Sequence, residues 1–266
     1  MELIVCVKQI PDPEAPPASF KVDPTANKVI PPPGVPPVIS PFDENAVEAA
    51  LRVKDARGGK ITVLSLGNNL VRDVVKKPLA MGADQLVLLE DASFTEGDSW
   101  STAYALAMAI KKIGTYDIIF CGRVAGDWDA GQVGSGIAEF LGIPSITVAK
   151  KVEVVDGKVR VERLVADGFE VVEAPMPCLV TVTSELGEPR YAPLKGIMAA
   201  AKKQPIIWKP QDIGVDPSKV GAQGRLTKLS KLFQPVKEAK CEIIGGDSPA
   251  EAAVNLALRL RQAKVI

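Results

Sequence analysis

The sequence predicts an α/β fold: a doubly wound, mainly parallel sheet with an antiparallel extension and an extended C-terminal arm. In residues 2–121, short apolar runs alternate with amphipathic segments in the order βαβαβαβ. Strands of a parallel sheet are covered by helices on both faces, so they read as continuous apolar runs. Strand-like runs on either side of Asp156-Gly157 predict the antiparallel extension, and the loss of periodicity beyond residue 205 predicts the arm.

The parallel core is expected in the first half of the chain. Strands are predicted at residues 2–9, 60–66, 85–89 and 116–121, and helices at residues 43–57, 70–81 and 99–113. Asp43 and Asp98 are the expected N-caps of the first and third helices, because a short acidic side chain accepts hydrogen bonds from exposed backbone N–H groups. Pro78 is expected to break the last turn of the second helix.

Prolines set one segment of this half apart. Of the 22 prolines, 11 lie between Pro11 and Pro41, in a stretch with little helical or strand periodicity. The sequence therefore predicts an extended, preformed loop there. A loop of that length in a compact domain is usually functional or bound to a partner.

The second half is expected to complete the sheet and then leave it. The predicted elements are a helix at 132–141, strands at 143–148, 151–155, 158–165 and 177–182, a possible strand at 169–173, and helices at 195–203 and 248–264. Residues 207–238 have few core-sized apolar clusters. We therefore expect a nucleotide-binding α/β domain over residues 1–204 and an arm over residues 205–266 that wraps a partner.

Composition excludes several classes of function. Lys+Arg and Asp+Glu both number 32, so the net charge of zero gives no overall field for nucleic acid or for an anionic membrane surface. The chain has no His, which removes the commonest general base, the Ser/His and Cys/His nucleophiles and most catalytic zinc sites. We expect no nucleic-acid partner, and hydrolase functions lose most of their support.

The cysteines and the apolar runs indicate the compartment. Cys6, Cys121, Cys178 and Cys241 are far apart, and none belongs to a C-x-x-C metal clip. The first three lie in apolar runs, which predicts buried free thiols in a reducing environment. No basic and apolar leader opens the sequence, and no apolar stretch reaches the ~18 residues that a membrane span needs. A soluble, cytoplasmic protein that is not embedded in a membrane is expected.

The most informative stretch is CGRVAGDWDAGQVGSG at residues 121–136, which leaves an apolar strand and enters a helix. In doubly wound sheets ligands lie at the carboxyl ends of strands, where a helix N-terminus attracts phosphate. The stretch is neither G-x-G-x-x-G nor a P-loop, so a purely structural turn remains an alternative. Asp127 and Asp129 would repel a phosphate, and are expected to cap the helix or to bind hydroxyl groups.

Three other segments are expected at the same edge of the sheet: residues 6–8, 66–69 and 40–43. Together they would form a nucleotide pocket in which Lys8 or Arg123 compensates phosphate charge. A regulatory nucleotide-binding module without a redox role stays open. So does a nucleotidyl or phosphoryl transferase in which Asp127 and Asp129 hold Mg²⁺, although no phosphate-gripping Lys/Ser-Thr motif is present.

Six segments then carry a resemblance to a known family. VCVKQIPD, SPFDENAVEAALRVKD, PLAMGAD, DWDAGQVG, GEPRYAPLKGIMAAAKK and KPQDIGVD resemble, in order and spacing, the electron transfer flavoprotein β subunit, over nearly the whole chain. The resemblance implies a heterodimer with an α subunit, an FAD held mostly by that α subunit, and a nucleotide bound within β. It also implies an electron carrier rather than an enzyme with its own substrate.

The resemblance also implies the nucleotide site. It places around the nucleotide Cys6, Ser40, Pro41, Phe42, Asp43, Leu66, Arg123, Val124, Ala125, Gly126, Asp127, Trp128, Asp129, Ala130, Gly131, Gln132, Val133 and Gly134. In most members the ligand is AMP, whereas electron-bifurcating members hold a second FAD there and typically read DGDTAQVG. Here Trp128 replaces the Gly and Ala130 replaces the Thr, and the turn SPFD is closer to the AMP type. AMP is favoured, with a second FAD as the alternative.

A partner-recognition loop is implied near residues 185–203. In the family, a leucine there anchors into acyl-CoA dehydrogenase-type flavoenzymes, and Leu194 occupies its position. An exposed Leu between Pro193 and Lys195 would act as an apolar anchor on a polar rim. The alternative is that Leu194 packs on its own helix.

Overall fold

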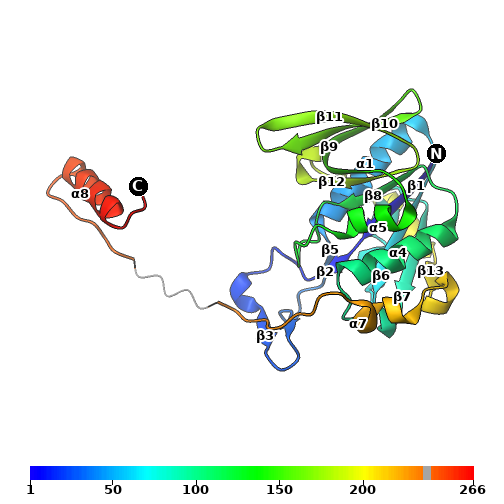
Figure 1. Cartoon of the computed structure of the whole chain (residues 1–266), viewed down its shortest axis with the longest axis horizontal. Coiled ribbons are helices and arrows are strands. Elements are labelled where there is room, and N and C mark those ends of the chain that lie inside the picture. The colour runs from blue at the N-terminus through cyan, green and yellow to red at the C-terminus, as the bar shows by residue number, and fades with distance from the viewer. Residues whose placement is uncertain (236–240) are drawn as a thin grey trace. The chain divides into compact units, whose positions relative to one another are not determined.

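The computed structural model describes residues 1–235 and 241–266, and the chain divides into two compact units, Met1–Lys231 and Leu232–Ile266. Among the described residues of the first unit, a nine-stranded sheet has the order β11-β10-β9-β12-β8-β1-β6-β7-β13 (Figure 1). Its strands are β1 (Glu2–Val7), β6 (Lys60–Gly67), β7 (Gln85–Glu90), β8 (Ile118–Gly122), β9 (Ser145–Val155), β10 (Lys158–Val165), β11 (Gly168–Pro175), β12 (Cys178–Val182) and β13 (Ile206–Trp208).

Strand pairing confirms the predicted fold class. β1 pairs in parallel with β6 and β8, and β12 pairs in parallel with β8 and β9. The antiparallel extension consists of β10 between β9 and β11. The expected strands at 143–148 and 151–155 form one continuous strand, β9, whose first part pairs with β12 and whose second part pairs with β10.

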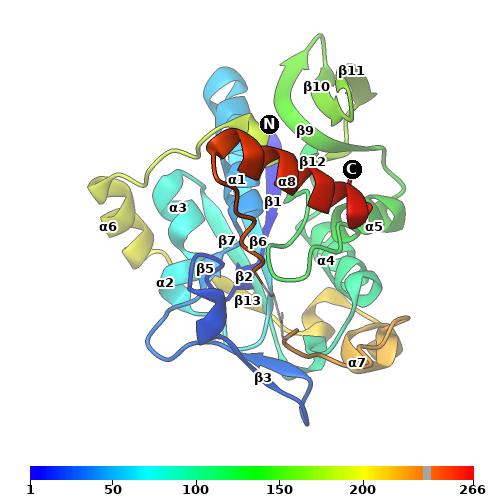
Figure 2. The ribbon, with the colours of Figure 1, turned by 90° about the vertical axis from the view of Figure 1, so that its left-hand side faces the viewer.

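Helices cover both faces of the sheet (Figure 2). One face packs against α1 (Pro41–Arg57), α2 (Arg72–Val75) and α3 (Lys77–Met81), and the other against α4 (Ser99–Ile113) and α5 (Val133–Leu141). Successive side chains of a strand point to opposite faces, so Leu3 and Val5 of β1 join the core with α1, while Ile4 and Cys6 join the core with α4.

Two of the predicted helix boundaries change in the structure. Asp98 caps α4 as predicted, in a capping box with Ser101. The prediction that Asp43 caps α1 is wrong: α1 begins at Pro41, whose fixed φ suits a first helical turn, and Asp43 lies inside that turn. Residues 70–81 form two short helices rather than one, and Pro78 lies in the first turn of α3.

The proline-rich segment is more ordered than expected. It contains a short 3₁₀ helix, η1 (Pro17–Ser19), and an antiparallel pair formed by β3 (Lys21–Asp23) and β4 (Lys28–Ile30). Its two ends are joined by β2 (Gln9–Ile10) and β5 (Val38–Ile39). This pairing returns the chain to the end of β1 immediately before α1.

The first unit continues past the expected domain boundary at residue 204. β13 adds a parallel strand beside β7, which the sequence did not predict because three residues beside Pro205 carry no detectable period. Short elements follow: η4 (Pro210–Ile213), η5 (Pro217–Lys219) and α7 (Gly221–Gly224). Earlier short elements are η2 (Ala92–Phe94), η3 (Ser184–Leu186) and α6 (Leu194–Lys202).

The second unit contains α8 (Pro249–Gln262), close to the predicted helix at 248–264. Ser248 caps it by accepting a hydrogen bond from the Glu251 N–H at 3.2 Å. Part of the predicted irregular stretch at 207–238 lies outside the described residues. In the part of the chain that the structure describes, no helix is both long enough and apolar enough to cross a membrane.

Candidate functional site

The sheet reverses its winding between β1 and β8. After β1 the chain adds β6 and then β7 on one side, and it returns for β8 on the other side of β1. In open α/β sheets the crevice at the carboxyl ends of the strands beside such a reversal is where ligands bind. All the segments expected to form the nucleotide pocket meet at this edge.

Asp43 joins the two strand ends at the crevice. Its Oδ2 accepts a hydrogen bond from the Lys8 N–H at 2.8 Å, and its Oδ1 accepts one from the Gly122 N–H at 3.0 Å. A Cβ at Gly122 would lie 2.5 Å from that Oδ1, so only glycine allows the contact. Burial raises the pKa of Asp43 from 3.8 to about 7, and the two backbone hydrogen bonds offset only part of this rise.

An ion pair also joins the residue after β1 to the loop that follows β8. Lys8 Nζ lies 2.8 Å from both carboxylate oxygens of Asp127. The Gly126 N–H donates to the buried Ser40 Oγ at 3.3 Å, which fixes the loop against the turn before α1. Asp127 therefore neither caps α5 nor stands free as a Mg²⁺ ligand, and the expectation that it caps the helix is wrong.

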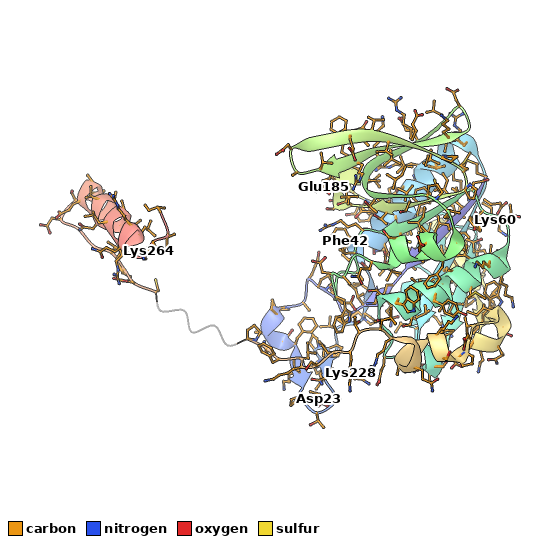
Figure 3. The ribbon with its side chains drawn as sticks, in the orientation of Figure 1. Asp23, Phe42, Lys60, Glu185, Lys228 and Lys264 are labelled. Atoms are coloured by element: carbon orange, nitrogen blue, oxygen red, sulfur yellow. The ribbon has the colours of Figure 1, made fainter. Side chains whose placement is uncertain are left out.

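Residues 123–134 form a loop between β8 and the first turn of α5. The Arg123 N–H donates to the Val182 carbonyl at 2.8 Å, and its guanidinium lies 4.9 Å from the ring centre of Phe42. Figure 3 shows Phe42 and Glu185 at the same end of the first unit. Asp129 is exposed and Trp128 is 60% exposed, so neither side chain packs in the core.

The N-terminus of α5 offers backbone N–H groups to the crevice. Its N-cap, Gln132, makes no side-chain capping bond, and Asp129 does not cap it either. Gly134 is buried, and a Cβ there would lie 2.6 Å from Thr181 Cγ2. This close approach fixes the first turn of α5 against β12. The uncapped amides and the helix dipole can stabilise an anionic group such as phosphate.

Cys6, Leu66 and Cys121 come from the neighbouring strands β1, β6 and β8, respectively, on the face that carries α4. Cys6 and Cys121 are buried, as predicted, and both are free thiols. The pKa of Cys121 is raised well above its ordinary value, by a hydrogen bond with Cys6 and by burial. The Cys121 thiol is therefore neutral, and it adds no charge to this end of the sheet.

The remaining predicted site residues lie in the same segments. Ser40 is buried, Pro41 is exposed and Phe42 is half-buried. In the loop after β8, Val124, Ala125 and Val133 are half-buried, and Ala130 and Gly131 are exposed. The sequence missed how these segments are linked, because neither the Lys8–Asp127 pair nor the Asp43 bridge has a local signature.

Leu194 lies on a separate surface, at the first residue of α6. Tyr191 is 97% exposed, Leu194 is 73% exposed, and Ile197 and Met198 are also exposed. The alternative in which Leu194 packs on its own helix is therefore wrong. Residues 188–203 lie within the expected partner-recognition loop at 185–203, and we call them the docking segment after that expectation.

Comparison with known proteins gives a consistent result. The electron transfer flavoprotein domain family matches residues 29–213. The electron transfer flavoprotein subunit beta of Thermoanaerobacterium thermosaccharolyticum is 41% identical over the full length of both chains. The caffeyl-CoA reductase-Etf complex subunit CarD of Acetobacterium woodii is 38% identical over the full length of both. Protein FixA of Azorhizobium caulinodans is 39% identical over 90% of this chain and 86% of its own.

The raised pKa of Asp43 predicts a pH dependence of stability. Between about pH 4 and pH 7, the folded chain keeps a proton on Asp43 that the unfolded chain has released, so raising the pH through this window lowers the free energy of unfolding. In Asp43→Asn this dependence is absent. The difference in melting temperature between wild type and variant should therefore shift against wild type as the pH rises, and a shift in the opposite direction would show that Asp43 is ionised throughout.

Proposed function

Because the chain belongs to the electron transfer flavoprotein β-subunit family, we propose that it pairs with an α subunit and binds AMP in the β1/β8 crevice. In this role it helps to pass electrons through the FAD of the αβ dimer, between flavin dehydrogenases and a downstream acceptor. The observation that carries the proposal is the meeting of four segments at the carboxyl edge of β1 and β8, held by the Asp43 bridge. The FAD, held mostly by the α subunit, supplies the redox chemistry.

The crevice has the donors that an adenosine phosphate needs. The uncapped N-terminus of α5 and the backbone of residues 123–134 would hold the phosphate, and Arg123 adds a positive charge beside them. Cys6 and Leu66 would form the floor beneath the nucleoside, and the turn at residues 40–43 its side wall. In this arrangement AMP is a structural ligand that joins the loop to the sheet.

The AMP part of FAD could bind the same donors, so the identity of the ligand needs a direct test. We favour AMP because Trp128 replaces the Gly and Ala130 the Thr of the loop in bifurcating members of the family. The test is to denature the purified heterodimer and to count the released nucleotides. One flavin and one AMP per dimer support the proposal, two flavins without AMP replace it by a bifurcating type, and no flavin overturns the electron-carrier role.

The four free cysteines support a reducing location for this carrier. Cys6, Cys121 and Cys178 are buried and Cys241 is exposed, and none of them is in a disulfide. Free thiols persist where the glutathione and thioredoxin systems keep them reduced. We accordingly place the protein in the cytoplasm.

We expect Gly134→Val to release the crevice nucleotide. A side chain at this position collides with Thr181, so the first turn of α5 must move away from β12. Overpacking of this kind costs about 1 to 3 kcal/mol, and the heterodimer should melt at a lower temperature. The α-bound flavin should remain reducible. The control is Glu139→Val, an exposed position of the same helix; full nucleotide content in Gly134→Val would remove α5 from the site.

The exposed apolar side chains of the docking segment fit a dehydrogenase partner of the acyl-CoA dehydrogenase type. Leu194 stands beside Pro193, which limits the conformations of the chain before it is bound. Lys195 and Lys202 are exposed on α6 and favour an acidic partner surface. The segment therefore combines an apolar anchor with a basic rim.

Leu194→Ala should weaken partner binding without changing the flavin. Truncation of an apolar anchor costs about 1 to 3 kcal/mol, or roughly tenfold to a hundredfold in affinity. The measurement is electron exchange between the heterodimer and butyryl-CoA dehydrogenase, with butyryl-CoA as reductant, at several dehydrogenase concentrations. Val171→Ala, which shortens an exposed apolar side chain of β11, is the control. Unchanged exchange in Leu194→Ala at subsaturating dehydrogenase would show that this surface is not the contact.

The C-terminal arm is proposed to pack on the α subunit. None of the residues of α8 is buried within the chain, and Val254, Leu256 and Leu258 are 47–58% exposed. An amphipathic helix that exposes its apolar residues in this way is stabilised when a partner covers them.

Leu256→Asp should therefore reduce the amount of α subunit that co-purifies with the tagged chain, because a carboxylate in an apolar interface costs free energy unless it is paired. Gln262→Asp introduces the same charge at an exposed polar position of α8 and should leave co-purification unchanged. Equal yields of α subunit with both variants would place α8 outside the subunit interface.

A further inference from the structure

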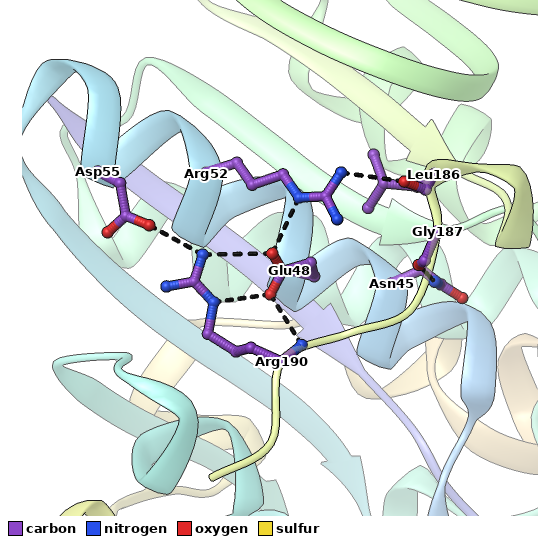
Figure 4. Close-up of polar contacts among 7 residues, drawn as sticks. All are labelled: Asn45, Glu48, Arg52, Asp55, Leu186, Gly187 and Arg190. Carbon is purple, nitrogen blue, oxygen red and sulfur yellow. Dashed lines mark hydrogen bonds and ion pairs between the residues drawn. The ribbon is translucent and has the colours of Figure 1, made fainter. Parts of the chain in front are cut away.

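One side of α1 binds Leu186 and Gly187, the two residues that precede the docking segment (Figure 4). Asn45 Nδ2 donates to the Gly187 carbonyl at 2.9 Å, and Arg52 Nη1 donates to the Leu186 carbonyl at 3.0 Å. Residues three or four apart lie on one side of a helix, so Asn45, Glu48, Arg52 and Asp55 form a continuous polar stripe. This stripe fixes the chain where it leaves η3.

Glu48 is the centre of the stripe. Its side chain is 6% exposed, and it accepts four hydrogen bonds: one from Arg52 Nε and three from Arg190. The donors in Arg190 are its backbone N–H at 3.2 Å, Nε at 2.8 Å and Nη2 at 3.2 Å. Burial alone would raise the pKa of Glu48, but the bonds from Arg190 and Arg52 outweigh it and the pKa is lowered. The carboxylate is therefore ionised, and each of its two oxygens accepts two hydrogen bonds.

Arg190 thus has both its main chain and its side chain fixed by one buried carboxylate. Its Nη2 also donates to Asp55 Oδ2 at 2.8 Å, at the exposed end of the stripe. The next residue, Tyr191, is almost fully exposed, and Leu194 follows three residues later. The direction in which the chain enters the exposed apolar surface is therefore set at Arg190.

The far end of the docking segment is fixed independently. α6 packs closely on α3, and a Cβ at Gly196 would lie 2.2 Å from the Ala80 carbonyl oxygen. Lys203 Nζ donates to the Asp84 carbonyl at 2.8 Å, and Lys76 Nζ donates to the Ala201 carbonyl at 3.2 Å. Tyr191 and Leu194 lie between two fixed ends.

We propose that Arg190 is a positioning residue for partner docking: its bond to Glu48 holds Tyr191 and Leu194 in their binding arrangement before the partner arrives. The inference rests on the proposed docking role of Leu194. A segment that is already ordered loses less conformational entropy on binding, and this loss is a main cost of association. A buried ion pair is often replaceable without loss of stability by apolar groups, so its value here is the geometry that it imposes.

The test compares variants of the αβ heterodimer in the exchange assay with butyryl-CoA dehydrogenase. In Arg190→Gln the KM for the dehydrogenase should rise about tenfold, because the segment then loses conformational entropy when the partner binds. The kcat at saturation should stay near that of wild type. Arg190→Lys keeps the charge but not the forked contact, and should recover part of the affinity. Hydrogen exchange of the amides at residues 188–194 should be faster in Arg190→Lys than in wild type, and faster still in Arg190→Gln.

Two control variants separate positioning from general destabilisation. Ile110→Val shortens a fully buried side chain of α4 and should lower the melting temperature without raising KM. Asp55→Asn removes only the exposed partner of Arg190, and should keep KM within about twofold of wild type. If Ile110→Val raises KM as much as Arg190→Gln does, the effect is loss of stability and the positioning role is overturned.

Leu194→Ala distinguishes this inference from the proposed function. A raised KM in Leu194→Ala with an unchanged KM in Arg190→Gln overturns the positioning role and leaves the docking surface in place. An unchanged KM in both overturns the docking surface, and the inference with it. Raised KM in both, with faster amide exchange only in Arg190→Gln, supports the inference.

Discussion

The carboxylate of Asp43 is the contact on which the crevice depends. A doubly wound sheet separates the connections that follow the two strands at its point of reversal, so β1 and β8 are adjacent but lead to different loops. Asp43 accepts one backbone N–H from the end of each strand and ties both to the first turn of α1. Burial raises the pKa of Asp43, and the close approach of its Oδ1 leaves no room for a side chain at Gly122.

A charged layer lies outside this buried bridge. The Lys8–Asp127 pair is partly exposed, so by itself it adds little stability. Lys8 and Asp127 offset each other's charge, and the uncapped α5 amides and Arg123 remain as positive groups of the loop. The local field therefore favours an anion at the helix N-terminus, although the loop itself contains two aspartates.

Helix α1 serves two surfaces with different chemistry. Its first turn carries Asp43 toward the crevice, while the stripe that contains Glu48 faces the residues before the docking segment. Both contacts use a buried acidic side chain: Asp43 accepts from two backbone N–H groups, and Glu48 accepts mainly from arginine side chains. Because one helix bears both acidic side chains, it links the β1/β8 crevice to the residues that lead into the exposed segment at 188–203.

The sequence by itself determined the alternating core, the antiparallel extension, the cap at Asp98 and the segments that gather at one sheet edge. These follow from local periodicity, from glycine and proline positions and from the rule that parallel strands end together. The tertiary structure alone decided that Asp43 bridges two strands, that Lys8 pairs with Asp127, that β13 joins the sheet and that Arg190 binds Glu48. The hydrogen-bonded partners are 35 to 142 residues apart, and β13 is too short to show a period, so only packing brings these residues together.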